Sequence, residues 1–586
     1  MAGSSTREVI TLQFGHYSNF VGTHWLNIQE NSFCYDPNSS NQQEINHDVL
    51  FREGLTARGQ QTYTPRLMIF DLKGSLRSLP QYGTLYQTSS YHNESPWWGE
   101  VSVHESKPEP KNEFQLDLEA EELEAMAVDN RTRDQAYAVD NETSNRPSIS
   151  FVSEDDDKPL REKFYDLDQD ISVWSDFLGT SLHPKSIQLV RDFLHGGHAN
   201  PFDVFGYGEG VAKDEYFYDE FESNLHFFVE ECDSLQGFQI FADVCNGFGG
   251  LCNYLLEELK DEYGRKSFVT FGMTETQLPD GTTKETAYRI LNSALSYGQL
   301  SQHSDIFIPL SLASEAVPHT GPPREFPLLN YKPYLSYHTS SVLGVCVDTI
   351  TMPYRLITQQ ASNMSSFIDS VAHGERKIAS FSLSFPLPVD ENNSLASFLG
   401  SRLQSYGREL LQCISPGVSN SSSLISQSAV VRGIPVTHAY NPEKNISTQT
   451  SLQSKNPLEA CASVNEIVRT FLENVHPNTS PLCWNVNQAC MVKPPFPNIF
   501  APKVNSYGFS VEGYVRPENT RVNQTNVLSR LETNSSIGNM LLSLVQWAKK
   551  ANISKHHVFL ESGIEAESFN GLLEELSSLS QRYENP

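Results

Sequence analysis

The sequence lacks the features of a chain that is inserted into a membrane or exported. No segment holds about 18 consecutive apolar residues without charge, so we expect no membrane-spanning helix. The N-terminus, MAGSSTREVITLQF, has no apolar stretch of signal-peptide length and is not rich in arginine. We therefore expect neither a secretory signal nor a mitochondrial matrix presequence there.

The chain also has little positive charge. It contains 42 lysines and arginines against 71 aspartates and glutamates, a formal net charge of −29. A protein of this charge is poorly suited to neutralising phosphates, so a nucleic-acid-binding role and simple adhesion to anionic lipid are both disfavoured.

Cysteine and nucleophile motifs are absent as well. The nine cysteines form no CxxC pair, and their odd number fits free thiols in a reducing compartment. Cys245 and Cys252 lie on either side of a glycine-rich turn, where further metal ligands are lacking and buried thiols are the better interpretation. We find no Walker motif, and no GxSxG or Cys–His signature of a nucleophile.

What is present is the pattern of a large α/β protein. At 586 residues the chain is too long for one hydrophobic core, so two or more domains are expected. Short apolar runs alternate with helical segments, which indicates an open parallel sheet. The predicted strands include residues 9–14, 67–70, 238–244 and 306–310, and the predicted helices include 19–29, 215–232 and 250–260.

The pattern changes along the chain. Residues 106–168 are acidic and poor in apolar side chains, which predicts a disordered insert. Residues 378–385 alternate apolar and polar side chains, as a half-exposed strand does. The predicted divisions are an N-terminal α/β domain in two parts (1–105 and 169–320), the acidic insert (106–168), a second α+β domain (321–510) and a C-terminal helical region (511–586).

The most informative segment is residues 237–260, GFQIFADVCNGFGGLCNYLLEELK. An apolar strand leads through a glycine-rich turn into an amphipathic helix, an order by which α/β proteins direct N–H groups at a phosphate. Phe248 stands between two glycines, where a phosphate loop usually has a small or hydroxylated residue. Taken alone the turn is a weak signal, and a βα turn without a ligand is the favoured interpretation.

Four segments, in order along the chain, resemble the tubulin family. The segment just described is similar to tubulin's GFQ strand and GGGTGSG turn, and REVITLQFGHYSNFVG (7–22) to its N-terminal strand and first phosphate loop. YTPRLMIFDLKGS (63–75) is similar to YVPRAVLVDLEPGT, and LNSALSYGQLSQHSD (291–305) to YNATLSVHQLVENSD. The departures EECDSLQGFQIF, WSDF and VDTITMPYR resemble the Misato family, tubulin-like proteins of the cytosol and mitochondrial surface. The close resemblance covers about the first 360 residues.

The resemblance implies a tubulin-like fold with a guanine-nucleotide pocket, and it places five residues in that pocket. Gly15, Asn19, Gly247 and Gly249 fall on positions that line the phosphates, and Asn292 falls near the loop by the ribose. Other positions depart from the family pattern: Tyr17 and Ser18 replace a cysteine and a glycine, Phe248 replaces a threonine, and Lys73 replaces an acid that faces the metal. We expect Lys73 to be solvated.

The departures also remove the water-activating acids. Residues 341–347, SVLGVCV, stand where tubulin has NVDLTEF; Asp348 follows, and as a loop carboxylate we expect it to be solvated. Hydrolysis of a nucleoside triphosphate needs charge stabilisation and a positioned water. We therefore predict no GTP hydrolysis, no catalytic or metal-binding residues, and no cofactor beyond a vestigial GTP site. The pairs His195, His198 and His556, His557 lack acidic or cysteine ligands at metal-site spacing, which favours a loop role.

The resemblance implies a non-catalytic protein that regulates mitochondrial distribution, morphology and fusion. It would be peripheral on the cytosolic face of the outer membrane and also cytoplasmic. Its implied partners are mitochondrial outer-membrane proteins, tubulin, and the cytosolic chaperonin and prefoldin that fold tubulin, with a part in spindle organisation. Two alternatives stay open: a tubulin-like GTPase that hydrolyses GTP on self-assembly, and an adaptor that works through its acidic insert.

Overall fold

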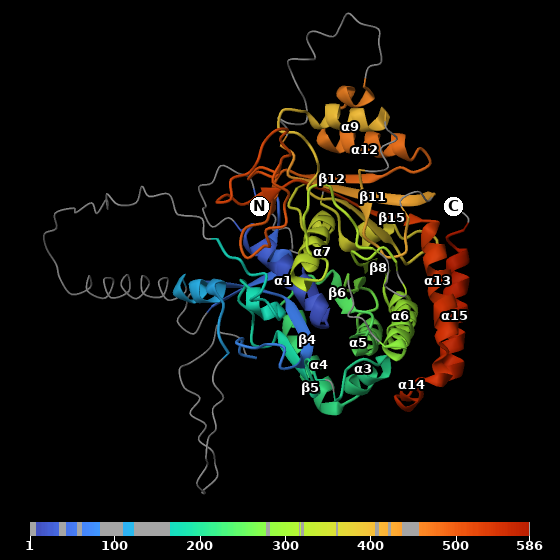
Figure 1. Cartoon of the computed structure of the whole chain (residues 1–586). Coiled ribbons are helices and arrows are strands. Elements are labelled where there is room, and N and C mark those ends of the chain that lie inside the picture. The colour runs from blue at the N-terminus through green and yellow to red at the C-terminus, as the bar shows by residue number, and fades with distance from the viewer. Residues whose placement is uncertain are drawn as a thin grey trace, which may run out of the picture.

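The structure, a computed structural model, is built around two sheets and a central helix between them (Figure 1). It describes residues 7–33, 43–55, 61–81, 109–121, 164–197, 199–276, 282–315, 317, 322–358, 361–404, 410–419, 423–435 and 456–584. Among the helices within these ranges, none is both long and apolar enough to cross a membrane.

The first sheet has six strands, and all of its neighbouring pairs are parallel. Its order is β5-β4-β1-β6-β7-β8, so successive strands are added outward on both sides of β1. The predicted parallel sheet is thereby confirmed. Its strands are β1 (Val9–Phe14), β4 (Leu67–Lys73), β5 (Ile187–Leu194), β6 (Gly237–Asp243), β7 (Ser267–Met273) and β8 (Ile306–Leu310).

Helices cover both faces of this sheet. Along β1, Ile10, Leu12 and Phe14 belong to one hydrophobic cluster and Val9 to another, because successive side chains of a strand point to opposite faces. The two clusters supply the burial that holds the layers together. One face is covered by α1 (His16–Glu30) and α7 (Ser336–Ile350); the other carries α3 (Phe205–Ala212), α4 (Glu215–Glu230), α5 (Gly247–Glu262) and α6 (Thr283–His303).

The second sheet is mixed and has the order β10-β9-β15-β11-β12. It packs on α7 with one face and on α9 (Leu395–Gln404) and α12 (Val464–Val475) with the other (Figure 1). Every residue of β9 is buried, so the prediction of a half-exposed strand at 378–385 is wrong. Two serines of β9 bond β15: the hydroxyls of Ser380 and Ser382 donate to the carbonyl and the carboxylate of buried Glu532. The strands are β9 (Ser380–Ser384), β10 (Gln412–Cys413), β11 (Leu424–Arg432), β12 (Leu482–Val486) and β15 (Val527–Asn534).

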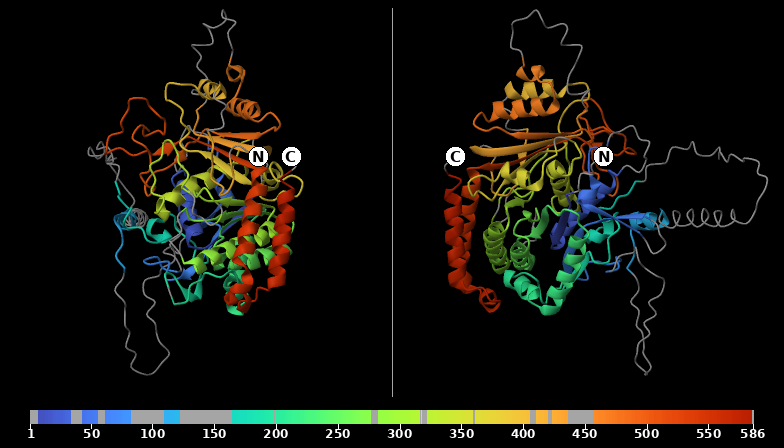
Figure 2. Two further views of the ribbon diagram at one scale, coloured as in Figure 1. Left: turned by 45° about the vertical axis from the view of Figure 1, so that its right-hand side comes forward. Right: turned by 180° about the vertical axis from the view of Figure 1, so that it is seen from behind.

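The C-terminal helices stand beside the first domain. Two long antiparallel helices, α13 (Ser536–Ala551) and α15 (Ala566–Gln581), lie against α6, with short α14 (His557–Glu561) between them (Figure 2). Because β15 belongs to the second sheet, the helical region begins at Ser536 and not at the predicted 511.

The remaining elements are short. They are β2 (Phe51–Leu55) and β3 (Gln61–Pro65), β13 (Cys490–Met491) and β14 (Gln524–Thr525), helix α8 (Met364–Asp369), and the 3-10 turns η1 (His47–Val49), η2 (Trp174–Phe177), η3 (Met352–Tyr354), η4 (Pro457–Ala460) and η5 (Ile553–Lys555).

Both ends of the predicted insert pack on the folded core. Residues 113–121 form a helix whose Phe114 is only 8% exposed and lies with its ring centroid 5.8 Å from that of Tyr165. Asp168 pairs with His338 of α7 at 2.7 Å. The prediction of a disordered insert is therefore wrong at these two ends, because each supplies apolar or charged partners to the core. Residues 122–163 lie outside the described residues.

Candidate functional site at the switch point of the first sheet

Four of the five predicted nucleotide-pocket residues lie where the carboxyl ends of β1 and β6 are side by side: Gly15, Gly247, Gly249 and Asn292. The chain runs outward from β1 to β4 and β5 on one side, and β6, β7 and β8 lie on the other. Open α/β sheets bind ligands in the crevice at such a switch point. Gly15 follows β1, Asp243 ends β6, and Gly247 begins α5, so the fold brings three segments that are distant in sequence to one edge.

Asp243 occupies the N-terminus of α1. Its Oδ1 accepts hydrogen bonds from the backbone N of Ser18 at 2.8 Å and from the Ser18 hydroxyl at 2.7 Å. Its Oδ2 accepts from the backbone N of Tyr17 at 3.2 Å. A helix N-terminus offers its free N–H groups and positive end to an anion. Here the chain's own carboxyl group, that of Asp243, occupies this position.

Gly15 makes this contact sterically feasible. It has φ +108°, a conformation that L side chains rarely adopt, and a Cβ built there would lie 2.3 Å from Asp243 Oδ2. The glycine that the sequence predicts beside a phosphate therefore lies directly against the carboxylate of Asp243.

Asp243 is only 5% exposed, and this burial is the largest influence on the pKa of its carboxyl group. Burial raises the pKa of Asp243 to about 7, although the hydrogen bonds from Ser18 oppose the rise. Nearby Glu275 raises this pKa further. Asp243 is thus a carboxyl group whose charge changes near neutral pH.

The glycine-rich turn is used for helix packing. The N–H of Gly247 donates to the carbonyl of Phe202 at 3.0 Å, and the Asn246 side chain caps the N–H of Phe248 at 3.0 Å. A Cβ at Gly208 of α3 would lie 1.8 Å from the carbonyl oxygen of Gly247. The absence of side chains at these glycines therefore lets α3 approach the backbone of α5 directly.

Phe248 and Gly249 are equally enclosed. The Phe248 ring is 3% exposed and lies 5.0 Å from the Phe202 ring, centroid to centroid. A Cβ at Gly249 would lie 2.2 Å from the hydroxyl of Ser296 on α6. Side chains of the protein thus surround the turn.

Asn292 of α6 is fully engaged by the backbone. Its Oδ1 accepts from the N–H of Phe205 at 2.9 Å, and its Nδ2 donates to the carbonyls of Asp203 at 2.7 Å and Cys245 at 3.0 Å. These bonds join the start of α3 to the turn before α5. The residue predicted near a ribose therefore fastens the segment that covers the glycine turn.

Asn19 lies on the other side of β1, in a network around Asp71 of β4. Its Nδ2 donates to Asp71 Oδ2 at 3.0 Å and to the Phe70 carbonyl at 3.2 Å. Trp174 Nε1 donates to the same Oδ2 at 2.8 Å, and the Leu72 N–H donates to Oδ1 at 2.8 Å. Asp71 is completely buried, and these donors offset the cost of its burial.

Two histidines complete this network. His16 Nδ1 lies 3.1 Å from Asp71 Oδ2, and the ring of His195 lies 4.0 Å from that of His16. Burial by itself would lower the pKa of His16, but Asp71, together with Asp243 and Glu275, outweighs burial, so this pKa is raised. Burial by itself would raise the pKa of Asp71, but His16, together with the hydrogen bonds from Leu72 and Asn19, outweighs burial, so this pKa is lowered. Burial lowers the pKa of His195, and His16 adds to that effect.

The loop role expected for His195 rested on sequence spacing, which places no acidic or cysteine ligand beside it. In the fold His195 does follow β5, but its ring lies against His16 and its ligand atom lies within 4.8 Å of that of Asp71. Sequence spacing missed the cluster because His16 follows β1, Asp71 lies near the end of β4 and His195 follows β5, and only the order of the sheet brings these strands together. The available signal was that His16 and Asp71 each come after an apolar run. His198 lies outside the described residues.

Asp348 does not behave as a solvated loop carboxylate. It lies near the end of helix α7, is fully buried, and bonds Arg355 Nη1 at 2.9 Å and Arg432 Nη1. Residues 341–347 are also buried within this helix. No carboxylate of this stretch faces a surface within the described residues, because α7 is enclosed between the two sheets. Lys73, by contrast, is exposed.

The remaining candidates fit structural roles. Cys252 is buried, and burial raises the pKa of its thiol; Cys245 Sγ lies 3.4 Å from the Ser293 hydroxyl. The His556 ring packs against Tyr288 at 5.4 Å.

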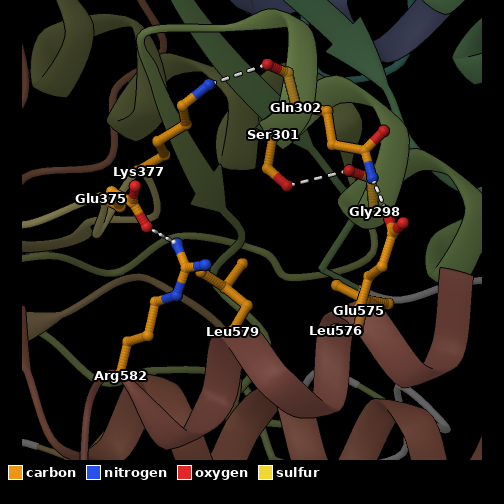
Figure 3. A pocket seen from close by; sticks show the side chains of 9 residues that line it. All are labelled: Gly298, Ser301, Gln302, Glu375, Lys377, Glu575, Leu576, Leu579 and Arg582. Carbon is orange, nitrogen blue, oxygen red and sulfur yellow. Dashed lines mark hydrogen bonds and ion pairs between the residues drawn. The ribbon is translucent and has the colours of Figure 1, made fainter.

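A separate pocket of about 440 Å³ lies between α6 and α15 (Figure 3). Its charged side chains engage neighbouring groups: Arg582 bonds Glu375 at 2.7 Å, and Lys377 donates to the Gln302 carbonyl at 2.8 Å. Gln302 and Glu575 form a third contact across the pocket. These pairings leave the pocket no convergent set of reactive groups.

Comparison with known proteins identifies the family. The family model for the Misato Segment II tubulin-like domain matches residues 7–120, and a tubulin domain model matches residues 167–356. Protein misato homolog 1 of Bos taurus is 34% identical over 100% of this chain and 99% of its own length. The Danio rerio homolog is 33% identical over 98% and 97%, and Protein misato of Drosophila melanogaster is 29% identical over 99% and 98%. The chain therefore belongs to the Misato family of tubulin-like proteins.

Proposed function

We propose that this protein is a tubulin-like protein that acts without binding or hydrolysing GTP, and that it regulates mitochondrial distribution, morphology and fusion. The observation that carries the first part is the Asp243 carboxylate, which takes three hydrogen bonds at the N-terminus of α1. A phosphate placed there would meet the atoms of this carboxyl group, which fill the space, and above about pH 7 it would also meet their negative charge.

Two further features support this proposal. The N–H of Gly247 and the amide of Asn292 bond the segment 202–205, which covers the glycine turn. The stretch 341–347 is enclosed within α7, so it offers no acid to a second subunit's nucleotide. Binding of a nucleotide would require these internal contacts to break.

The mitochondrial part rests on the family resemblance. We propose a peripheral association with the cytosolic face of the outer membrane, alongside a cytoplasmic pool. We also propose association with tubulin and with the cytosolic chaperonin and prefoldin, and a part in spindle organisation. Alkaline carbonate should release the protein from isolated mitochondria, and protease added outside should digest it; resistance to both would contradict a peripheral location.

The nucleotide proposal is tested with purified full-length protein. We expect nucleotide extracted from the denatured protein to contain no guanine nucleotide in proportion to the chain, and GTP turnover to equal that of buffer. Tubulin handled in parallel is the positive control. Stoichiometric guanine nucleotide, or turnover that rises with protein concentration, would favour the alternative of an assembling GTPase.

The variant Asp243→Asn sharpens this test. It removes the competing charge at the N-terminus of α1 and keeps the side-chain size. If charge is the main obstacle, Asp243→Asn should bind more GTP than wild type. The control variant Asp219→Asn, which changes an exposed carboxyl group of α4, should bind GTP as wild type does. Equal binding by wild type and both variants at stoichiometric levels would contradict the proposed obstruction.

A further inference from the structure

His16, Asp71 and His195 form a compact set of metal-ligand types at the edge of the first sheet. Each offers one nitrogen or oxygen ligand atom, and these atoms lie within 4.8 Å of one another. His16 begins α1, Asp71 lies in β4, and His195 follows β5. Three separate segments therefore present ligands to one point.

The carboxylate is held in place independently of the histidines. Trp174 Nε1, Asn19 Nδ2 and the Leu72 N–H all donate to Asp71, which is completely buried. Such hydrogen bonds from surrounding groups orient the ligands of metal sites and are part of their design. The His195 loop is likewise fixed, because the His195 N–H donates to the Lys73 carbonyl at 2.9 Å.

An unpartnered oxygen lies beside the cluster. Asn19 Oδ1 is buried and has no hydrogen-bond partner among the described residues, although its amide Nδ2 contacts Asp71. Buried polar atoms are nearly always satisfied by protein or by ordered water.

The donor set selects the class of ion. Two imidazoles and one carboxylate suit zinc and neighbouring transition metals, whereas magnesium prefers oxygen ligands and several waters. The His16 side chain is 22% exposed and His195 is half-buried, so an ion and its water can reach the ligands from solvent.

We propose that His16, Asp71 and His195 bind one divalent transition-metal ion of the zinc type, without any nucleotide. The ion would link the start of α1, β4 and the loop after β5. It would carry three protein ligands and a solvent-filled position.

The test uses full-length protein that has been treated with a chelator and then dialysed. Zinc is titrated and counted per chain, and cobalt serves as a spectroscopic probe because its visible absorption reports nitrogen and oxygen ligation. We expect about one zinc per chain and a higher melting temperature with zinc, with GTP absent.

Two variants make the assignment specific. His195→Gln removes a half-buried ligand and leaves the donors to Asp71 in place; the loss of affinity should be at least the roughly 10- to 100-fold that loss of an outer partner costs. His226→Gln changes a histidine of α4 that is 42% exposed on its side chain, and it should bind zinc as wild type does.

Several outcomes would overturn the proposal. They are wild-type protein that binds no zinc, equal zinc binding by His195→Gln and wild type, and binding that requires GTP. If His195→Gln misfolds, the cobalt spectrum of the wild type decides alone: a spectrum identical to that of cobalt in buffer overturns the site. None of these outcomes depends on whether GTP is hydrolysed.

Discussion

The carboxylate at the N-terminus of α1 makes a prediction about stability and pH. Burial raises the pKa of Asp243 to about 7 in the folded protein from its ordinary value of 3.8. Between these two values the folded state holds a proton that the unfolded chain has released. The folded state is therefore favoured at low pH, and this contribution to stability is lost as the pH rises through the window.

The magnitude follows from the two values. The difference between 3.8 and about 7 corresponds to about 4 kcal/mol of unfolding free energy in total. About 2 kcal/mol of this falls between about pH 5.5 and about pH 8, a range above the sequence pI of 5.0. Asp243→Asn has no proton to release and lacks this dependence.

The assay compares the free energy of unfolding of wild type and Asp243→Asn in urea at several pH values. The variant's advantage over wild type should grow by about 2 kcal/mol from about pH 5.5 to about pH 8, because all other titrating groups are shared. The exposed control Asp219→Asn should run parallel to wild type. Parallel curves for Asp243→Asn would refute the reasoning. A wild-type advantage that grows with pH would show that Ser18 and the helix N-terminus outweigh burial.

Three further predictions concern packing. Gly208→Ala places a Cβ 1.8 Å from the Gly247 oxygen and should destabilise the protein by about 1–3 kcal/mol or more. Gly210→Ala in the same helix meets nothing within 4 Å and should stabilise the protein by about 0.5–1 kcal/mol. Equal shifts of the melting temperature for the two variants would contradict the contact between α3 and α5. Asp348→Asn leaves two buried guanidinium groups without their carboxylate and should lower the free energy of unfolding in urea by about 3–5 kcal/mol. The same change at exposed Asp369 should lower it little. A small effect at Asp348 would argue against the buried pairing. From its acidic composition, we expect deletion of residues 122–163 to leave the melting temperature unchanged. Deletion of 106–168 also removes Phe114 and Asp168 and should lower it, and Phe114→Ala alone should lower the free energy of unfolding by about 3 kcal/mol. Equal melting temperatures for the two deletions would show that the two ends of the insert contribute nothing to stability.

Local sequence patterns were sufficient for most of the first domain. The predicted strands 9–14 and 306–310 agree with β1 and β8, because buried parallel strands are short continuous apolar runs. The pattern failed at β9, whose alternating serines indicate an exposed face. Those serines are buried, because hydrogen bonds to Glu532 and neighbours satisfy them.

For the candidate site, too, the sequence identified the segments but did not reveal their contacts. The segments around Gly15, Gly247 and Asn292 could be recognised by sequence because each has a local signature of glycines or of a family match. What their polar groups bond could not be predicted: the partners Asp243, Phe202 and Phe205 depend on strand order and on how α3 crosses α5. The cluster of His16, Asp71 and His195 was missed for the same reason.

The sequence by itself determined the fold class, the family and the absence of acids in residues 341–347, since each of these is written in local order and composition. Only the tertiary structure decided that Asp243 lies on the N-terminus of α1 and that Asp348 is buried between two arginines. The physical reason is that the energies of carboxylates depend on burial and on partners distant in sequence. The sequence does not distinguish a solvated loop aspartate from a buried one; the arrangement of strands and helices around it does.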